Sequence, residues 1–298
     1  MSCALSTANL SKRFGNVLVL DDLQLEVPQG SVFGLIGENG AGKTTTIKIL
    51  VNILRPTTGR AEVLGVDSCD LGAEHLAKIG YVSENQGMPD WMTVGAFLEY
   101  LKPFYPTWDA AHAQRLIRQF ELPPDRKLRD LSRGMRMKAA LASSLAYRPR
   151  LIVLDEPFTG LDPLVREDLI AGLGECAGET TIFISSHDLA EVESFVSHVG
   201  YLNKGRLKFS ETMSSLIARF REIELTLGLS AMLPADDEWP ASWLQRQGTP
   251  ARVRFVETRF DQEQTTTEIR RRFGTVEHLS INPMPLRAIF IALAREGK

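Results

Sequence analysis

The amino-acid sequence predicts an α/β fold with a parallel sheet at its centre, and two observations predict it. Three short runs, 31–36, 151–154 and 181–184, are apolar except for a polar first residue in two of them, and Gly-rich or polar residues follow each run. Strands that are apolar on both sides are typical of a parallel sheet that helices cover on both faces. The second observation is that helical patterns alternate with these runs over about the first 220 residues.

Two segments, one before this parallel core and one within it, show a different pattern of apolar residues. Residues 17–27 alternate between apolar and polar side chains around Asp21 and Asp22, which is typical of antiparallel strands. We therefore expect an antiparallel β edge before the parallel core. The segment from about 88 to 145 is rich in helix formers, is interrupted by prolines and lacks β-branched runs. It predicts a helical subdomain inserted between core strands.

The last part of the chain has a different pattern of apolar and polar residues. Beyond about residue 220, two stretches alternate like half-exposed strands, and a helical stretch follows the second of them. We therefore expect a first domain over 1–220 and a small C-terminal α+β accessory domain over 221–298. Within the accessory domain, Trp239 and Trp243 are expected to be core residues.

Composition and charge exclude several classes of protein. The 298 residues are 44% hydrophobic and 24% charged, unlike disordered or collagenous chains. The net charge of −3 gives no overall positive field, so no nucleic-acid partner is expected. No run approaches the ~18 apolar residues of a membrane span, the first residues lack signal-peptide features, and the three cysteines are scattered. We therefore expect a soluble cytoplasmic protein.

The strongest motif is a glycine-rich loop. Residues 37–44 read GENGAGKT, a full match to the P-loop (Walker A) pattern G-x-x-x-x-G-K-[ST], between an apolar run and a helical segment. Glycines let backbone N–H groups surround a polyphosphate, and the N-terminus of the next helix adds partial positive charge. Lys43 can reach the β- and γ-phosphates, and Thr44 offers a hydroxyl to Mg²⁺. The motif predicts a P-loop NTPase (RecA-like) core with nucleotide-binding residues Gly37, Glu38, Asn39, Gly40, Ala41, Gly42, Lys43, Thr44 and Thr45.

Polar residues follow two of the apolar runs. Asp155 and Glu156 come directly after 151–154, and His187 comes shortly after 181–184. Ligands of open α/β sheets bind at the carboxyl ends of the strands. Asp155 is therefore expected to hold Mg²⁺, and Glu156 to activate a water as general base. The His187 imidazole is expected to contact the γ-phosphate and to link it to Glu156.

Together with further motifs, these residues resemble the ATP-binding cassette (ABC) ATPases. The stretch 131–135, LSRGM, is similar to the LSGGQ signature of that family, and 160–162, GLD, to its D-loop. His187 looks like the switch histidine, and Glu84 stands where the family usually has the Q-loop glutamine. Phe14 looks like the aromatic residue that stacks on adenine. The resemblance extends over the whole first domain.

The resemblance implies that two cassettes pack head to tail around ATP. The facing copy then covers the γ-phosphate with its Ser132 hydroxyl and Gly134 N–H, and Asp162 of the D-loop joins this nucleotide site. Because the chain carries one signature, a homo- or heterodimer is expected to be active. The chain resembles the single-cassette ABC-2/YtrB-like bacterial type, which serves separate permeases. Permease subunits are therefore expected to dock near 84–94 and to hold the protein at the inner face of the cell membrane.

The motifs depart from the pattern of the family at four positions. Arg133 replaces a signature glycine, and it either contacts a phosphate of the facing nucleotide or impairs closure. Met135 replaces the signature glutamine. Glu84 replaces the Q-loop glutamine, and its carboxylate can still bind Mg²⁺ or a water of that ion. Phe14 replaces the commoner tyrosine and can still stack on a base.

Three interpretations of the function follow. The first is an ATP-binding transporter subunit that hydrolyses ATP at a dimer interface to drive a separate permease, and intact Lys43, Glu156 and His187 favour it. The second is a soluble ABC-type ATPase that acts on ribosomes or DNA, although the second cassette or long inserts of such proteins are missing. The third is a degenerate cassette that binds ATP without efficient hydrolysis, which Arg133 leaves open. A GTPase is excluded, because residues 203–206, NKGR, lack the aspartate of the guanine-reading motif.

Overall fold

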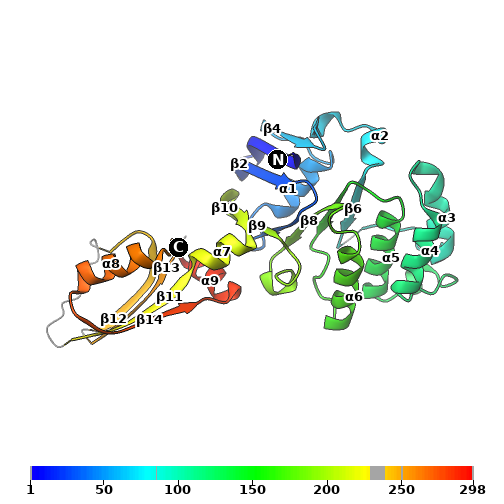
Figure 1. Ribbon diagram of the computed structural model, residues 1–298. Coiled ribbons are helices and arrows are strands. Elements are labelled where there is room, and N and C mark those ends of the chain that lie inside the picture. Colours follow the sequence, from blue (N-terminus) through cyan, green and yellow to red (C-terminus); the bar gives the residue numbers. More distant parts are fainter. Residues whose placement is uncertain (1, 85, 229–238, 250, 297–298) are drawn as a thin grey trace. The chain divides into compact units, whose positions relative to one another are not determined.

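The structure is a computed structural model that describes residues 2–84, 86–228, 239–249 and 251–296 (Figure 1). The chain divides into two compact units, Met1–Ser210 and Glu211–Lys298. In the described residues, the first unit has two β-sheets and the second has one, and each unit has an apolar core of its own.

An antiparallel sheet forms the N-terminal part of the first unit. In spatial order its strands are β2 (Val17–Pro28), β1 (Cys3–Phe14), β4 (Thr58–Val63) and β5 (Val66–Asp67). Neighbouring strands run antiparallel throughout. The side chains of Leu10, Leu20 and Leu23 have no exposed surface, so one face of this sheet is core. The antiparallel β edge predicted from the alternating pattern is confirmed.

A mostly parallel sheet forms the centre of the first unit. In spatial order its strands are β10 (Arg206–Thr212), β9 (His198–Asn203), β3 (Val32–Ile36), β8 (Thr181–Ser186), β7 (Leu151–Asp155) and β6 (Ile79–Ser83). The pairs from β9 to β6 are parallel. Every residue of β3, β7 and β8 is buried, which means that both faces of the sheet are covered, as predicted.

One apolar core joins the two sheets. Helix α1 (Lys43–Leu50) contributes Ile47 and Leu50 to it, next to Leu20 of β2 and Val153 of β7. The helix that follows the glycine-rich loop is therefore held between both sheets. Outside the region between β6 and β7, the other helical elements described in the first unit are η1 (Ser68–Asp70), α2 (Ala73–Leu76), α6 (Pro163–Gly174) and η4 (Leu189–Glu191).

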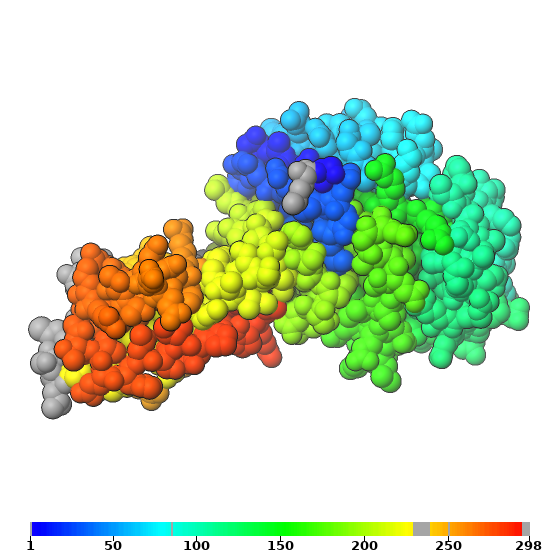
Figure 2. All heavy atoms as spheres, viewed as in Figure 1, coloured from blue at the N-terminus to red at the C-terminus, as the bar shows by residue number. Residues whose placement is uncertain are grey.

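The region between β6 and β7 is helical, as its composition predicted. It contains α3 (Val94–Leu101), η2 (Lys102–Phe104), α4 (Ala110–Gln119), η3 (Leu128–Asp130) and α5 (Arg133–Leu145). Thr93, Asp109 and Ser132 cap the three α-helices by accepting a hydrogen bond from a backbone N–H of the first turn. Figure 2 shows these helices (teal to green) as one closely packed body. In the described part of the chain, no helix is both long and apolar enough to cross a membrane.

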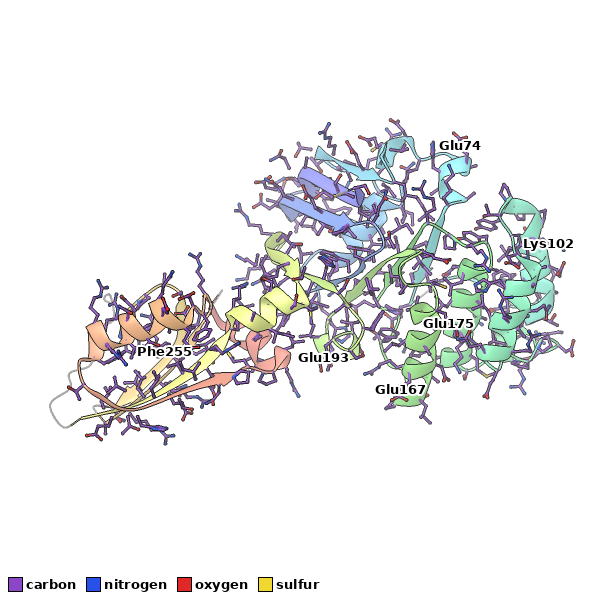
Figure 3. The ribbon with its side chains drawn as sticks, viewed as in Figure 1. Glu74, Lys102, Glu167, Glu175, Glu193 and Phe255 are labelled. Atoms are coloured by element: carbon purple, nitrogen blue, oxygen red, sulfur yellow. The ribbon has the colours of Figure 1, made fainter. Side chains whose placement is uncertain are left out.

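The second unit is an α+β module. Its strands lie in the order β12 (Trp243–Thr249), β13 (Arg252–Glu257), β11 (Arg221–Leu227) and β14 (Val276–Pro283), and its helices are α7 (Met213–Arg219), α8 (Gln262–Phe273) and α9 (Leu286–Glu296). Its core combines one sheet face with α8, and Phe255, labelled in Figure 3, belongs to it. Trp243 stacks on Phe255 with ring centroids 4.0 Å apart, and Trp239 packs at the edge of this core. Both tryptophans are core residues, as predicted.

Candidate active site

The glycine loop between β3 and α1 has a backbone that only glycine fits at two positions. A Cβ on Gly37 would lie 2.3 Å from the Leu202 carbonyl oxygen of β9. Gly42 has a φ of +109°, and a Cβ there would lie 2.6 Å from Leu20 Cδ2. Positive φ and close packing both exclude larger residues. The loop is therefore pressed against the sheet, with the N-terminus of α1 directly behind it.

Lys43 lies at the centre of this loop. Its Nζ donates hydrogen bonds to the carbonyl oxygens of Gly37 at 2.6 Å and Glu38 at 3.2 Å. Nζ is also 3.0 Å from Glu156 Oε1, and the side chains are only 5% and 13% exposed. The ammonium thus has a complete set of internal acceptors, and one of them is the predicted catalytic base.

Oxygen-bearing side chains meet beside the loop. Thr44 Oγ1 donates to Asp155 Oδ1 at 3.1 Å, and Ser185 Oγ donates to the same oxygen at 2.8 Å. Ser185 Oγ also accepts the backbone N–H of Glu156 at 3.0 Å. Ser185 is fully buried and fixes both acidic residues, yet sequence reasoning missed it. The only signal was its place directly after an apolar run.

Glu156 links the loop to His187. Its Oε2 accepts hydrogen bonds from His187 Nδ1 at 2.7 Å, from the His187 backbone N–H at 3.3 Å and from Thr159 Oγ1 at 3.2 Å. Burial raises the pKa of Glu156, but the His187 hydrogen bond and the Lys43 charge lower it by more, so this pKa lies below its usual value. The carboxylate is therefore ionised at neutral pH and can accept a proton. Glu156 also has a φ of +51°, which is uncommon for a residue with a side chain.

Strand register explains why these groups meet. Ile36 of β3 is paired with Ser186 of β8, and Ser185 is paired with Asp155 of β7. The three strands are parallel, so the residues after them lie at one edge of the sheet. Lys43, Thr44, Asp155, Glu156 and His187 are thereby brought into one connected network.

The other predicted residues lie in separate places. Ser132 Oγ accepts the Met135 N–H at 3.2 Å, and Asp162 Oδ1 accepts the Val165 N–H at 3.0 Å, so each caps its own helix. Gly134 packs so closely on Val165 that a Cβ would lie 3.0 Å from its Cγ1. No hydrogen bond or ion pair between described residues joins Ser132 or Gly134 to the network around Glu156.

Phe14 and Glu84, the predicted contacts to adenine and Mg²⁺, have neighbours that the sequence did not indicate. Phe14 is 46% exposed, with Lys12 Nζ 4.9 Å from the centre of its ring. The backbone N–H of Glu84 donates to the Asp155 carbonyl at 3.2 Å, next to the network. The Glu84 carboxylate accepts a 2.5 Å hydrogen bond from Arg133, which leaves its second oxygen for other contacts.

Among the described residues, no group of three or more His, Cys, Asp or Glu side chains is arranged to hold a metal ion. The Thr44 hydroxyl and the Asp155 carboxylate are hard oxygen donors, the type that Mg²⁺ prefers. Magnesium commonly keeps few protein ligands and takes the others from phosphates and water. The donor set at this edge therefore fits a magnesium ion that arrives with a polyphosphate.

Comparison with known proteins shows the family to which this chain is similar. A family model described as ABC transporter matches residues 20–159. The bacitracin transport ATP-binding protein BcrA of Bacillus licheniformis is 34% identical over 70% of this chain and 69% of its own length. The ABC transporter ATP-binding protein YtrB of Bacillus subtilis strain 168 is 31% identical over 72% and 74%.

A solved structure agrees as well. An ATP-binding subunit of an ABC transporter covers 72% of this chain and 92% of its own length, with a TM-score of 0.66 and 28% identity. The predicted fold and the resemblance to single-cassette, YtrB-like proteins are confirmed. The chain belongs to the ABC transporter family, as one of its ATP-binding ATPase subunits.

Proposed function

We propose that this chain binds ATP with Mg²⁺ on its glycine loop, hydrolyses it at an interface with a second cassette, and so drives a separate permease. One observation carries the proposal: the Glu156 carboxylate contacts both Lys43 and His187 at the carboxyl edge of the sheet. This arrangement supports an active cassette rather than a degenerate one. The relatives named above support a transporter rather than a soluble ATPase of another kind.

The loop supplies the binding contacts. Backbone N–H groups of residues 37–44 surround the phosphates, and Thr45 and Phe14 complete the nucleotide contacts, Phe14 by stacking on the base. Lys43 exchanges its internal acceptors for phosphate oxygens, which frees Glu156. Thr44, Asp155 and the second oxygen of Glu84 would hold Mg²⁺. When bound, that ion neutralises charge on the β- and γ-phosphates.

Glu156 and His187 act on the γ-phosphate side. The freed carboxylate orients a water and accepts its proton as the water attacks phosphorus. A carboxylate only accepts hydrogen bonds, so His187 Nδ1 carries a hydrogen toward Glu156. Nε2, on the opposite side of the ring, is left to contact the γ-phosphate and donates to it when it also carries a hydrogen. His187 thus positions the base and the phosphate relative to each other.

The second cassette, an identical or a related chain, completes the site. Ser132 and Asp162 are the N-caps of α5 and α6, so both stand at helix ends with partial positive charge. The Ser132 oxygen accepts one hydrogen bond from its own helix and keeps its proton to donate. We propose that the Ser132 hydroxyl and the Gly134 N–H both donate hydrogen bonds to the triphosphate on the facing cassette.

We expect Ser132→Ala to weaken ATP-dependent dimerisation about tenfold, because a hydrogen bond to a charged group is lost. ATP binding by the separate chain should change less than about twofold. Light scattering with and without ATP–Mg measures the first quantity, and calorimetry the second. The matched control is Thr93→Ala, which removes an equivalent cap from α3. Dimerisation equal to that of the unmodified chain would contradict the role of Ser132.

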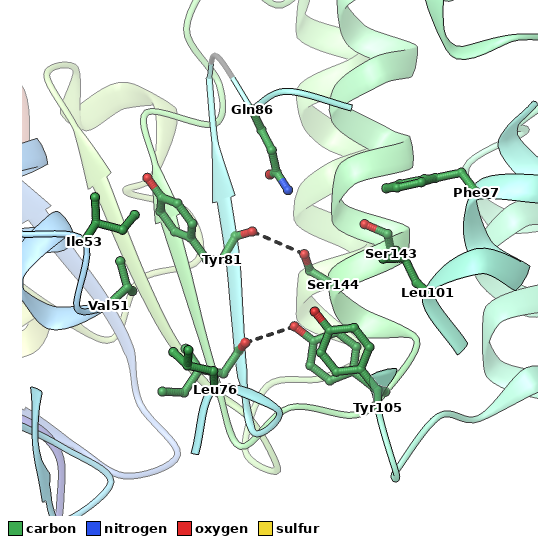
Figure 4. A pocket seen from close by; sticks show the side chains of 12 residues that line it. Val51, Ile53, Leu76, Tyr81, Gln86, Phe97, Leu101, Tyr105, Ser143 and Ser144 are labelled. Atoms are coloured by element: carbon green, nitrogen blue, oxygen red, sulfur yellow. Dashed lines mark hydrogen bonds between the residues drawn. The ribbon is translucent and has the colours of Figure 1, made fainter. Parts of the chain in front are cut away.

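A groove beside the site suits a permease helix. A cavity of about 290 Å³ lies between the central sheet and the helices α3 and α5. Figure 4 shows the side chains that line it: Val51, Ile53, Leu76, Ile79, Tyr81, Gln86, Phe97, Leu101, Tyr105, Ser143, Ser144 and Tyr147. Ile53 is 54% exposed at this groove. Gln86 Oε1 is buried there without a hydrogen-bond partner in the described part of the chain. These features favour an amphipathic helix that brings apolar side chains and one hydrogen-bond donor.

We expect Ile53→Asp to prevent co-purification with the permease, because it places a charge in an apolar contact. The ATPase rate of the separate chain should stay within about twofold, since Ile53 lies outside the network around Glu156. Ile217→Asp on α7 is the matched control, because Ile217 is also an exposed isoleucine. If both variants retain the permease equally well, the groove is not the docking site.

Further parts of the proposal concern location, cargo and domains. The protein acts in the cytoplasm, attached to the inner face of the cell membrane through the permease. A relative named for bacitracin transport favours bacitracin or a related compound as cargo. We propose that residues 1–220 form the cassette and 221–298 an accessory domain. This boundary follows α7, whereas the second compact unit begins before α7, at Glu211.

A further inference from the structure

Arg133 joins segments that lie far apart in the sequence. Its Nη2 donates a 2.5 Å hydrogen bond to Oε1 of Glu84, 49 positions earlier. Its guanidinium also lies against the turn after β7, because a Cβ on Gly160 would come within 2.7 Å of Nη1. From the first turn of α5, one side chain therefore reaches the loop after β6 and the turn that begins at Glu156.

Glu84 stands at the edge of the sheet where the phosphate-binding groups lie. Ser83 is paired in register with Asp155, and the Glu84 N–H donates to the Asp155 carbonyl at 3.2 Å. Adjacent strands are about 4.8 Å apart. Glu84 therefore adds a carboxylate to the edge that already carries Asp155 and Glu156. A triphosphate that binds at this edge approaches a further negative charge.

We propose that Arg133 is a positioning residue that holds Glu84 in a neutral ion pair and so prevents its charge from opposing ATP. The inference rests on the proposed function, because it concerns the same site. In this proposal Arg133 binds a carboxylate of its own chain. It then neither contacts a phosphate of the facing cassette nor blocks closure of the dimer. The side chains of Arg133 and Glu84 are 52% and 33% exposed, so the effect on affinity is moderate.

The test is a double-mutant cycle on the full chain with ATP–Mg as the probe. Arg133→Gln leaves the Glu84 charge unbalanced, and we expect it to raise both Kd and KM for ATP–Mg about threefold to fivefold. The value of kcat should change less than about twofold. Adding Glu84→Gln to this variant removes the unbalanced charge but keeps a side-chain oxygen that can contact Mg²⁺ or a water of that ion. The Kd should therefore return to within about twofold of the value for the unmodified chain. Arg133→Lys keeps the positive charge and should also retain the affinity.

Two conditions separate a charge effect from a structural one. The loss in Arg133→Gln should shrink in about 0.5 M salt, because exposed charges are screened. Kd is measured by calorimetry at concentrations where the chain is monomeric, since the ion pair lies within one chain. Arg148→Gln is the matched control: Arg148 forms a 2.9 Å ion pair with Asp109 beyond the other end of α5, and its side chain is 50% exposed.

The outcomes are distinct. Recovery of affinity in the double variant, with loss in Arg133→Gln alone, supports the inference. A double variant as weak as Arg133→Gln overturns it, and so does an unchanged Kd with weaker ATP-dependent dimerisation, which would place Arg133 on the facing nucleotide. An unmodified chain that neither binds nor hydrolyses ATP would contradict the proposed function itself.

Discussion

Replacing Glu156 with Gln is expected to lower the ATPase rate by about a hundredfold to ten-thousandfold while ATP–Mg still binds. The amide has nearly the same size as the carboxylate and can still accept the hydrogen bond from His187, but it cannot take a proton from water. In this variant, Lys43 has no ion pair with residue 156 when the loop is empty. The free-energy cost of moving its ammonium to the phosphates is therefore no higher than in the unmodified chain. Phosphate release measures turnover, and calorimetry measures binding.

The variant should also accumulate as an ATP-bound dimer, because hydrolysis no longer separates the two cassettes. Glu193→Gln is the control: Glu193, labelled in Figure 3, carries an exposed carboxylate after the neighbouring strand β8 and lies outside the network around Glu156. A Glu156→Gln variant that hydrolyses ATP at the unmodified rate would remove Glu156 from the role of base.

Replacing Lys43 with Ala is expected to weaken ATP–Mg binding about tenfold to a hundredfold, because a charged hydrogen bond to phosphate is worth about 1.5–3 kcal/mol. The same change also affects folding. Glu156 is only 13% exposed and would lose its ion pair with Lys43, leaving a poorly solvated charge. We expect a loss of about 1–2 kcal/mol in the free energy of unfolding, measured with urea.

The double variant Lys43→Ala with Glu156→Gln separates these two effects. It removes the uncompensated carboxylate, so stability should recover relative to Lys43→Ala while ATP binding remains weak. Binding that recovers together with stability would show that Lys43 acts on the fold of the loop and not on phosphate.

Local patterns in the sequence predicted much of this site. The apolar runs placed three strands, and parallel strands end at a common edge, so Asp155, Glu156 and His187 were expected to lie together. The glycine pattern placed Lys43 beside them.

Contacts that depend on tertiary packing could not be predicted. Ser185 bridges Asp155 and Glu156 only because β7 and β8 pair in one register, and a serine after an apolar run does not reveal its partner. The close approach of the Leu202 carbonyl to Gly37 comes from β9, which is distant in sequence. The same holds for Arg133 and Glu84, whose pairing needs α5 to fold back over β6.

The internal ion pair of Lys43 has a consequence for the end of each proposed catalytic cycle. When products leave, the ammonium regains its acceptors on Gly37, Glu38 and Glu156 without help from solvent or another protein. The Glu156 carboxylate is then paired with Lys43 until the next triphosphate arrives. An idle subunit thus returns by itself to a resting state in which its reactive carboxylate is shielded.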